Sequence, residues 1–117
     1  MIWTLSQVAL GGAIGSCLRY LAGVSFGAPM ATLAVNVLGS FVMGALFILL
    51  ASRTALSPLL MTGVLGGFTT FSAFSLDALK LWERGETLQA GGYVLASVLF
   101  SLAAVFAGAA LARGALT

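Results

Sequence analysis

The residues best suited to chemistry lie in one short segment, residues 66–75, which reads GGFTTFSAFS. Two glycines open the segment, and three hydroxyl side chains follow within an otherwise apolar stretch: Thr69, Thr70 and Ser72. Glycine lowers helix propensity by about 1 kcal/mol relative to alanine, and hydroxyl groups compete for backbone hydrogen bonds. The segment therefore predicts two half-helices separated by unwound chain.

Unwound backbone at membrane depth offers carbonyl groups that can bind an ion. Hydrocarbon provides no hydrogen-bond partner, so such backbone is tolerated only where it is buried in protein or lines a cavity. Carbonyls freed at a helix break can coordinate a monovalent cation, as in discontinuous transporter helices. The alternative is a kink packed against neighbouring helices, and residue spacing alone leaves both interpretations open.

Two phenylalanines follow the expected break. Phe71 and Phe74 stand three residues apart and so share one face if helix resumes there. An aromatic ring is negative on its face and positive at its edge, so rings presented edge-on can receive a small anion. Ordinary core packing is the competing interpretation.

Two polar stripes run through other apolar stretches at helical spacing. Their members are Thr32, Asn36 and Ser40 in one stripe, and Tyr93, Ser97 and Ser101 in the other. Asn36 is the most informative, because an amide buried without a partner is costly. Such residues often serve only as contacts between helices. Together with the segment 66–75, however, the two stripes are consistent with a continuous hydrogen-bonding track.

Few charges fall within the apolar stretches. Arg19 lies near the end of the first one, where it either extends to the membrane interface or supplies positive potential that concentrates anions. Asp77 is expected at an interface, paired with Arg84 or with Lys80 at helical i, i+3 spacing. No carboxylate is expected in mid-membrane.

The composition is that of a membrane protein: 61% of the 117 residues are hydrophobic and 7% are charged. A soluble domain has about a quarter charged residues. Four stretches approach the roughly 20 residues that cross a bilayer: Ser6–Val24, Met30–Ala51, Pro58–Leu81 and Leu88–Ala112. Short connectors predict antiparallel neighbours, and hence one all-α, four-span domain over residues 1–117.

Several classes of function are excluded by the same composition. No soluble catalytic domain fits outside the four spans, and no nucleophile–base pair is evident, so an enzyme is not expected. The single Cys17 and the absence of histidine argue against an internal disulfide and a transition-metal site. The scattered net charge of +2 does not form a nucleic-acid surface.

The charge distribution gives almost no preference for one membrane orientation. Arg53 and Arg113 share one side of the predicted topology, whereas Lys80, Arg84 and Arg19 lie on the other. This near-balance permits both insertions and an antiparallel, dual-topology homodimer. A fixed topology is the alternative, and the glycines of spans 1 and 2 fit either packing within one chain or a dimer seam.

The chain resembles a known family across its whole length. The segment 66–75 resembles the third-span signature of the bacterial fluoride channels, the Fluc or CrcB family. Residues 15–20, GSCLRY, resemble the first-span motif of that family, and residues 36–41, NVLGSF, resemble the second-span motif. Two positions depart from its pattern: Asp77 stands where Glu is common, and Ala73 stands where Thr is common.

The resemblance implies a homodimer of inverted subunits in the bacterial inner membrane, with two fluoride pathways and passive export of fluoride. Phe71 and Phe74 would be pore-facing rings, and Asn36 the amide donor of the pathway. Polar-track positions would be occupied by Thr32, Tyr93, Ser97 and Ser101. Arg19 would lie in a vestibule. The carbonyls of Gly66 and Thr69 from both subunits would hold a structural sodium ion at the dimer centre.

Two other functions remain to be weighed. A small four-span multidrug exporter shares the length but needs a membrane carboxylate, and spans 1 and 2 contain no Asp or Glu. A scaffold subunit without transport activity suits glycine-rich helices but does not account for three aligned polar stretches. The sequence therefore favours a fluoride channel.

Overall fold

The computed structural model describes residues 1–51 and 54–117 and is entirely helical in its regular elements. Four helical stretches are long and apolar enough to cross a membrane, as predicted. The first, second and fourth are α1 (Ile2–Phe26), α2 (Met30–Leu49) and α5 (Thr87–Leu116). Arg53, which entered the prediction of orientation, lies outside the described residues.

The third span, Pro58–Glu83, is divided into several elements. A short 3-10 turn, η1 (Thr54–Leu56), precedes the π-helical segment η2 (Pro58–Leu65). One further turn, α3 (Gly66–Phe68), ends at two extended residues, Thr69 (φ −87°, ψ 156°) and Thr70 (φ −155°, ψ 122°). Helix resumes as α4 (Phe71–Glu83), and its N-terminus is capped by the Thr70 hydroxyl, which accepts from the Ala73 amide at 3.1 Å. The break lies within the segment that the glycines and threonines marked.

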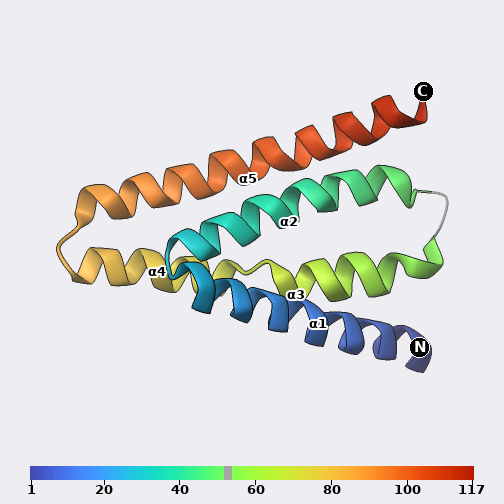
Figure 1. Ribbon diagram of the computed structural model, residues 1–117, viewed down its shortest axis with the longest axis horizontal. Coiled ribbons are helices and arrows are strands. Elements are labelled where there is room, and N and C mark those ends of the chain that lie inside the picture. The colour runs from blue at the N-terminus through green and yellow to red at the C-terminus, as the bar shows by residue number, and fades with distance from the viewer. Residues whose placement is uncertain (52–53) are drawn as a thin grey trace.

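The spans lie side by side, and both termini lie at the same end (Figure 1). α2 packs mainly against α5, whereas α1 packs mainly against η2 and α3. The tight turns between α1 and α2 and between α4 and α5 use Gly27 (φ 76°) and Gly85 (φ 80°), in a backbone conformation that disfavours other residues. The short connectors thus give the expected up-and-down order.

The glycines mediate backbone contact within the chain. A Cβ atom added to Gly67 would lie 2.6 Å from the Gly12 oxygen, and one added to Gly11 would lie 2.8 Å from Gly63 Cα. A Cβ on Gly44 would collide with the Val105 carbonyl, and one on Gly108 with the Phe41 carbonyl. These glycines therefore permit close helix approach inside one chain.

Candidate functional site

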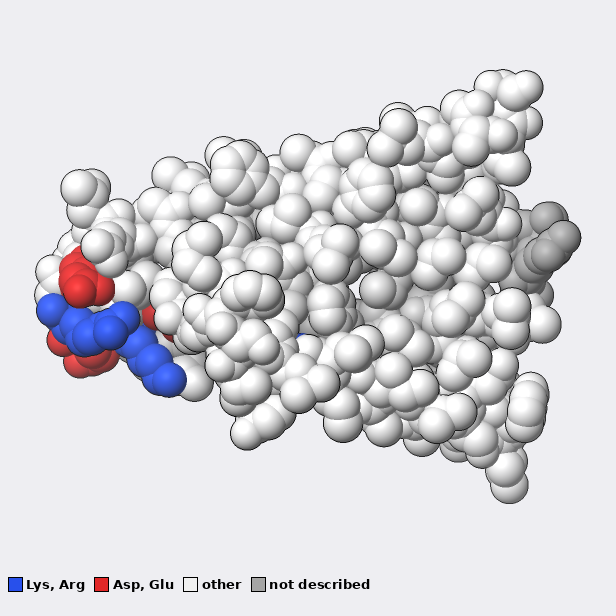
Figure 2. All heavy atoms as spheres, viewed as in Figure 1, with Lys and Arg blue, Asp and Glu red and all other residues white. Residues whose placement is uncertain are grey.

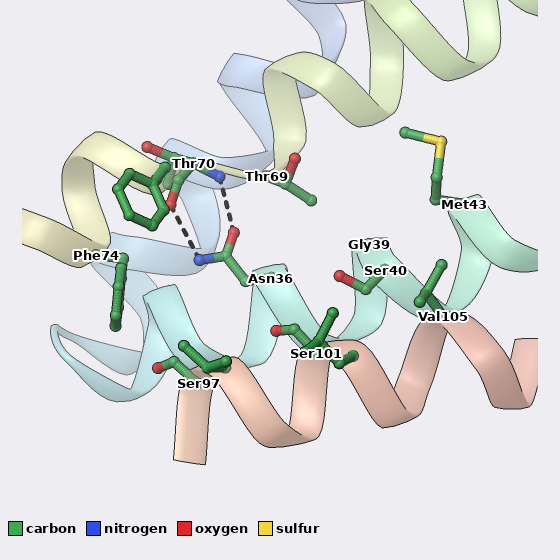
Figure 3. Close-up of a pocket in the computed structure, with 13 residues that line it drawn as sticks. Asn36, Gly39, Ser40, Met43, Thr69, Thr70, Phe74, Ser97, Ser101 and Val105 are labelled. Carbon is green, nitrogen blue, oxygen red and sulfur yellow. Dashed lines mark hydrogen bonds between the residues drawn. The ribbon is translucent and has the colours of Figure 1, made fainter. Parts of the chain in front are cut away.

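A cavity of about 440 Å³ lies between α2, the break in the third span and α5. Figure 3 shows side chains from all three regions around it. Among the described residues, no charged side chain contributes to the cavity wall. Its lining residues are Asn36, Gly39, Ser40, Met43, Thr69, Thr70, Phe71, Phe74, Ser97, Val98, Ser101, Leu102 and Val105.

Asn36 forms two hydrogen bonds with the backbone of one residue at the break. Its Nδ2 donates to the Thr70 carbonyl at 3.0 Å, and its Oδ1 accepts from the Thr70 amide at 2.7 Å (Figure 3). An interrupted helix leaves an amide such as that of Thr70 without an intrahelical acceptor. Asn36 therefore lines the cavity, as predicted from its type, and directs one N–H donor and one acceptor site to Thr70.

Arg19 reaches the same break from α1. Its Nε donates to the Gly67 carbonyl at 3.1 Å, and its side chain is half-buried. The residue also lines a second cavity of about 270 Å³, together with Thr32 and Asp77. The sequence had offered two roles for Arg19, interfacial or electrostatic, and the bond to Gly67 belongs to neither.

The α5 stripe supplies two hydroxyl groups to the 440 Å³ cavity, those of Ser97 and Ser101. Ser97 is buried, and its Oγ has no hydrogen-bond partner among the described residues. A buried hydroxyl without a partner is unusual, because its desolvation is not compensated. The Ser97 hydroxyl thus has an unused donor in the wall of the cavity.

The two phenylalanines both line the cavity but differ sharply in burial. Their ring centroids lie 5.4 Å apart with an interplanar angle of 54°. Phe74 is 7% exposed, whereas Phe71 is 77% exposed on a lone chain. The Phe74 ring is thus packed in the wall of the cavity, whereas the Phe71 ring lies on the outer surface of the single chain.

Tyr93 and Thr32 lie outside the lining of the 440 Å³ cavity. Tyr93 is buried behind Phe74, with ring centroids 5.3 Å apart, and Thr32 lines the neighbouring 270 Å³ cavity. The structure therefore gathers five of the seven predicted pathway residues around one space. These are Asn36, Phe71, Phe74, Ser97 and Ser101.

The predicted ion pair of Asp77 with Lys80 or Arg84 is wrong. Asp77 is 6% exposed, and its Oδ2 accepts a hydrogen bond of 3.2 Å from the Tyr93 hydroxyl. The ion pair in the described part of the chain is Arg84–Glu86, at 3.8 Å. The reason is the helical phase of α4, which places Asp77 one turn after buried Phe74, facing α5.

Four of the described charged residues gather at one end of the molecule. On the face shown in Figure 2, blue and red atoms cluster at the end of the molecule where α4 turns into α5. Lys80, Glu83, Arg84 and Glu86 occupy this stretch of sequence. The cavity therefore offers dipoles, hydroxyl groups and aromatic rings rather than formal charge.

The backbone carbonyls predicted to bind sodium are unpartnered in this structure. The Thr69 amide and hydroxyl both donate to the Leu65 carbonyl, at 3.0 and 2.9 Å. Within residues 1–51 and 54–117, no hydrogen bond reaches the carbonyl oxygens of Gly66 or Thr69. Neutral carbonyl oxygens are suitable ligands for a hard monovalent cation, so these residues fit the predicted ion.

Sequence reasoning missed some of the residues that shape the site. Thr70 provides the backbone groups that Asn36 binds, and its place within the segment 66–75 was the available signal. Met43 and Val105 line the cavity but resemble any apolar residue of a span. Nothing in the sequence distinguished them.

The fold and cavity define a class: a multi-pass helical membrane protein with a largely apolar cavity that carries a few uncharged polar groups beside an interrupted span. Residues 6–109 match the family described as CrcB-like protein, Camphor Resistance (CrcB). The chain belongs to this family.

Curated relatives align with this chain along nearly their whole length. A protein of Paracoccus denitrificans (strain Pd 1222), named fluoride-specific ion channel FluC, is 58% identical over 118 residues, covering 95% of each chain. Proteins with the same name from Cereibacter sphaeroides (strain ATCC 17029 / ATH 2.4.9) and Ruegeria sp. (strain TM1040) are 54% and 52% identical. The alignments cover 97% of this chain and 98% of the former protein, and 100% of both chains for the latter.

Proposed function

We propose that this protein is a passive, fluoride-selective channel that exports fluoride across the bacterial inner membrane. The observation that carries the proposal is the cavity without charged lining residues in the described chain, whose largely apolar wall includes an amide, hydroxyl groups and aromatic rings. The curated relatives are named as fluoride-specific channels, which supports the same ion.

The cavity wall suits a small, strongly hydrated anion. Asn36 retains one amide hydrogen after its bond to the Thr70 carbonyl, and the Ser97 hydroxyl has no partner in the described structure. Ring edges of Phe71 and Phe74 add weak positive potential. Conduction requires binding that replaces hydration without trapping the ion, and several weak donors satisfy that requirement. A fixed Lys or Arg in the wall would hold the anion more tightly.

We further propose that the working form is an inverted homodimer with two pathways. Phe71 is 77% exposed and Gly66 is also exposed, so the break lies at an open surface of the single chain. Unpaired carbonyls facing lipid are costly, so a protein partner is needed to cover this surface. The near-equal division of basic residues in the sequence supports insertion in both directions.

The same arrangement supports a structural sodium ion at the dimer centre. The carbonyls of Gly66 and Thr69 from both subunits would hold it, and bound sodium would supply a positive charge that fixes the two breaks together. Sodium depletion is expected to reduce dimer stability, measured by size-exclusion chromatography in sodium-free and sodium-containing buffer. An equal dimer fraction in both buffers would contradict the site.

Fluoride flux is tested by efflux from proteoliposomes recorded with a fluoride-selective electrode, with chloride efflux as the control. The wild-type protein is expected to release fluoride and retain chloride. The double variant Phe71→Ile, Phe74→Ile should lose fluoride flux while remaining a dimer. Phe26→Ile is the matched control, because Phe26 is 75% exposed at the end of α1 and lines none of the cavities described above. Unchanged flux in the double variant would remove the rings from the pathway.

A small multidrug exporter is not favoured by the curated relatives, which are named as ion channels. Its mechanism requires a membrane carboxylate exposed to a cationic drug. The buried carboxylate in this chain, Asp77, instead accepts from Tyr93.

A further inference from the structure

The break in the third span needs partners for the backbone groups that it frees. In a continuous helix each carbonyl accepts from the amide four residues further along the chain. The two extended residues, Thr69 and Thr70, interrupt this pattern. Two side chains from other spans bind there: Arg19 from α1 and Asn36 from α2.

Arg19 has no acidic partner that would explain its position. Of the described residues, none places a carboxylate oxygen within 4 Å of its guanidinium, since the recorded ion pair joins Arg84 and Glu86. The Nε atom instead donates to the Gly67 carbonyl at 3.1 Å. A hydrogen bond from a charged donor is stronger than one between neutral groups.

Asn36 forms the complementary contact on the other side of the break. Its Oδ1 replaces the missing backbone acceptor of the Thr70 amide, at 2.7 Å, and its Nδ2 donates to the Thr70 carbonyl at 3.0 Å. The Thr70 amide is thereby kept from the Gly66 carbonyl, which would be its acceptor in a continuous helix. Gly66 thus keeps a carbonyl that accepts no hydrogen bond from the described residues.

We propose that Arg19 and Asn36 are positioning residues that together hold the third span open at Thr69 and Thr70. We call this pair the clamp. By binding Gly67 and Thr70, the clamp leaves the carbonyls of Gly66 and Thr69 unpaired and fixes where α4 begins. Arg19 therefore acts by donating a hydrogen bond from Nε to the Gly67 carbonyl, rather than by attracting anions with its charge. The expected effect of the clamp on flux rests on the proposed fluoride function, whereas its effect on the backbone does not.

Three substitutions separate the donor of Arg19 from its charge. Arg19→Gln places an amide nitrogen at the same position along the side chain as Nε but carries no charge. Arg19→Lys keeps the charge but has a carbon atom at that position. Arg19→Met has neither. The clamp predicts that Gln retains most of the fluoride flux, whereas Lys and Met lose it by tenfold or more. If Lys retains flux and Gln loses it, Arg19 acts through charge and the clamp is overturned.

Hydrogen exchange provides a readout independent of transport. Peptides covering residues 66–72 are followed by mass spectrometry in detergent for the wild type and the variants. Arg19→Met and Asn36→Leu are expected to change exchange in this region about tenfold, and Arg19→Gln is expected to change it little. Ser101→Ala is the matched control for exchange, because Ser101 lines the cavity but contacts neither Gly67 nor Thr70. Unaltered exchange in Arg19→Met and Asn36→Leu overturns the clamp.

The two proposals fail in different ways. Absence of fluoride flux in the wild-type protein, together with the expected exchange pattern, would refute the channel function and leave the clamp supported. Robust wild-type flux with unaltered exchange in the variants would support the channel function and refute the clamp.

Discussion

The Tyr93 hydroxyl donates a hydrogen bond of 3.2 Å to the Asp77 carboxylate, and both residues are buried between α4 and α5. The phenolic group has a single proton, which this bond uses. The tyrosine therefore satisfies the carboxylate and at the same time packs its ring against Phe74. One side chain joins the aromatic wall of the cavity to the buried acid.

Tyr93→Phe should destabilise the protein by about 1 to 3 kcal/mol, because it leaves the Asp77 carboxylate buried without its donor. Adding Asp77→Asn should recover part of the loss, since an amide is less costly to bury than a carboxylate. Thermal unfolding in detergent measures both effects. Tyr20→Phe is the control, because Tyr20 is 69% exposed. A Tyr93→Phe variant as stable as Tyr20→Phe would contradict the role of the bond.

Phe74 and Phe71 should separate stability from transport. Phe74→Ala is expected to lower the free energy of unfolding by on the order of 3 kcal/mol, because a buried ring is lost from between Phe71 and Tyr93. Phe71→Ala removes an exposed ring and should leave monomer stability nearly unchanged while reducing fluoride flux. Unfolding and electrode recordings on the same preparations test the contrast. Equal destabilisation by both substitutions would refute it.

Ser97→Ala should stabilise the fold and slow transport. The buried Ser97 hydroxyl has no partner among the described residues, so its removal relieves a penalty on the order of 1 kcal/mol. The same hydroxyl is a proposed fluoride donor, so flux should fall. Chemical unfolding and efflux are both measured, with Ser75→Ala as the control because Ser75 is exposed and bonded to the Phe71 carbonyl. A less stable Ser97→Ala variant would mean that the hydroxyl has a partner.

The contact between α2 and α5 should tolerate no added carbon at Gly108. Gly108→Ala would drive a methyl group into the Phe41 backbone, so the two helices must separate and stability should fall by about 2 kcal/mol or more. Gly92→Ala on the same helix meets nothing within 4 Å and should stabilise α5 by up to about 1 kcal/mol. Melting temperatures of the pair provide the comparison. Similar shifts in both variants would exclude the backbone contact as the cause.

Sequence patterns predicted the spans well because each apolar stretch is bounded by turn residues such as Gly27 and Gly85. The site was predicted in part: residue type and spacing placed Asn36, Ser97 and Ser101 on cavity-facing stripes. The same spacing also suggested Thr32 and Tyr93, which the packing of α4 places elsewhere. The partner of Asp77 was predicted incorrectly, because the surroundings of this residue depend on where the helix resumes after the break. Such contacts between distant segments have no signature in local composition.

The main-chain contact between α1 and the third span has a consequence for the surrounding bilayer. The 25 residues of α1 extend about 37 Å, more than the roughly 30 Å thickness of a hydrocarbon core. Such a helix adapts to thinner or thicker lipid by changing its tilt. The backbones of Gly12 and Gly67 are in direct contact, with no side chains between them. A change in the tilt of α1 is therefore transmitted directly to the third span. We therefore expect a change in lipid chain length to displace the carbonyls beside Arg19.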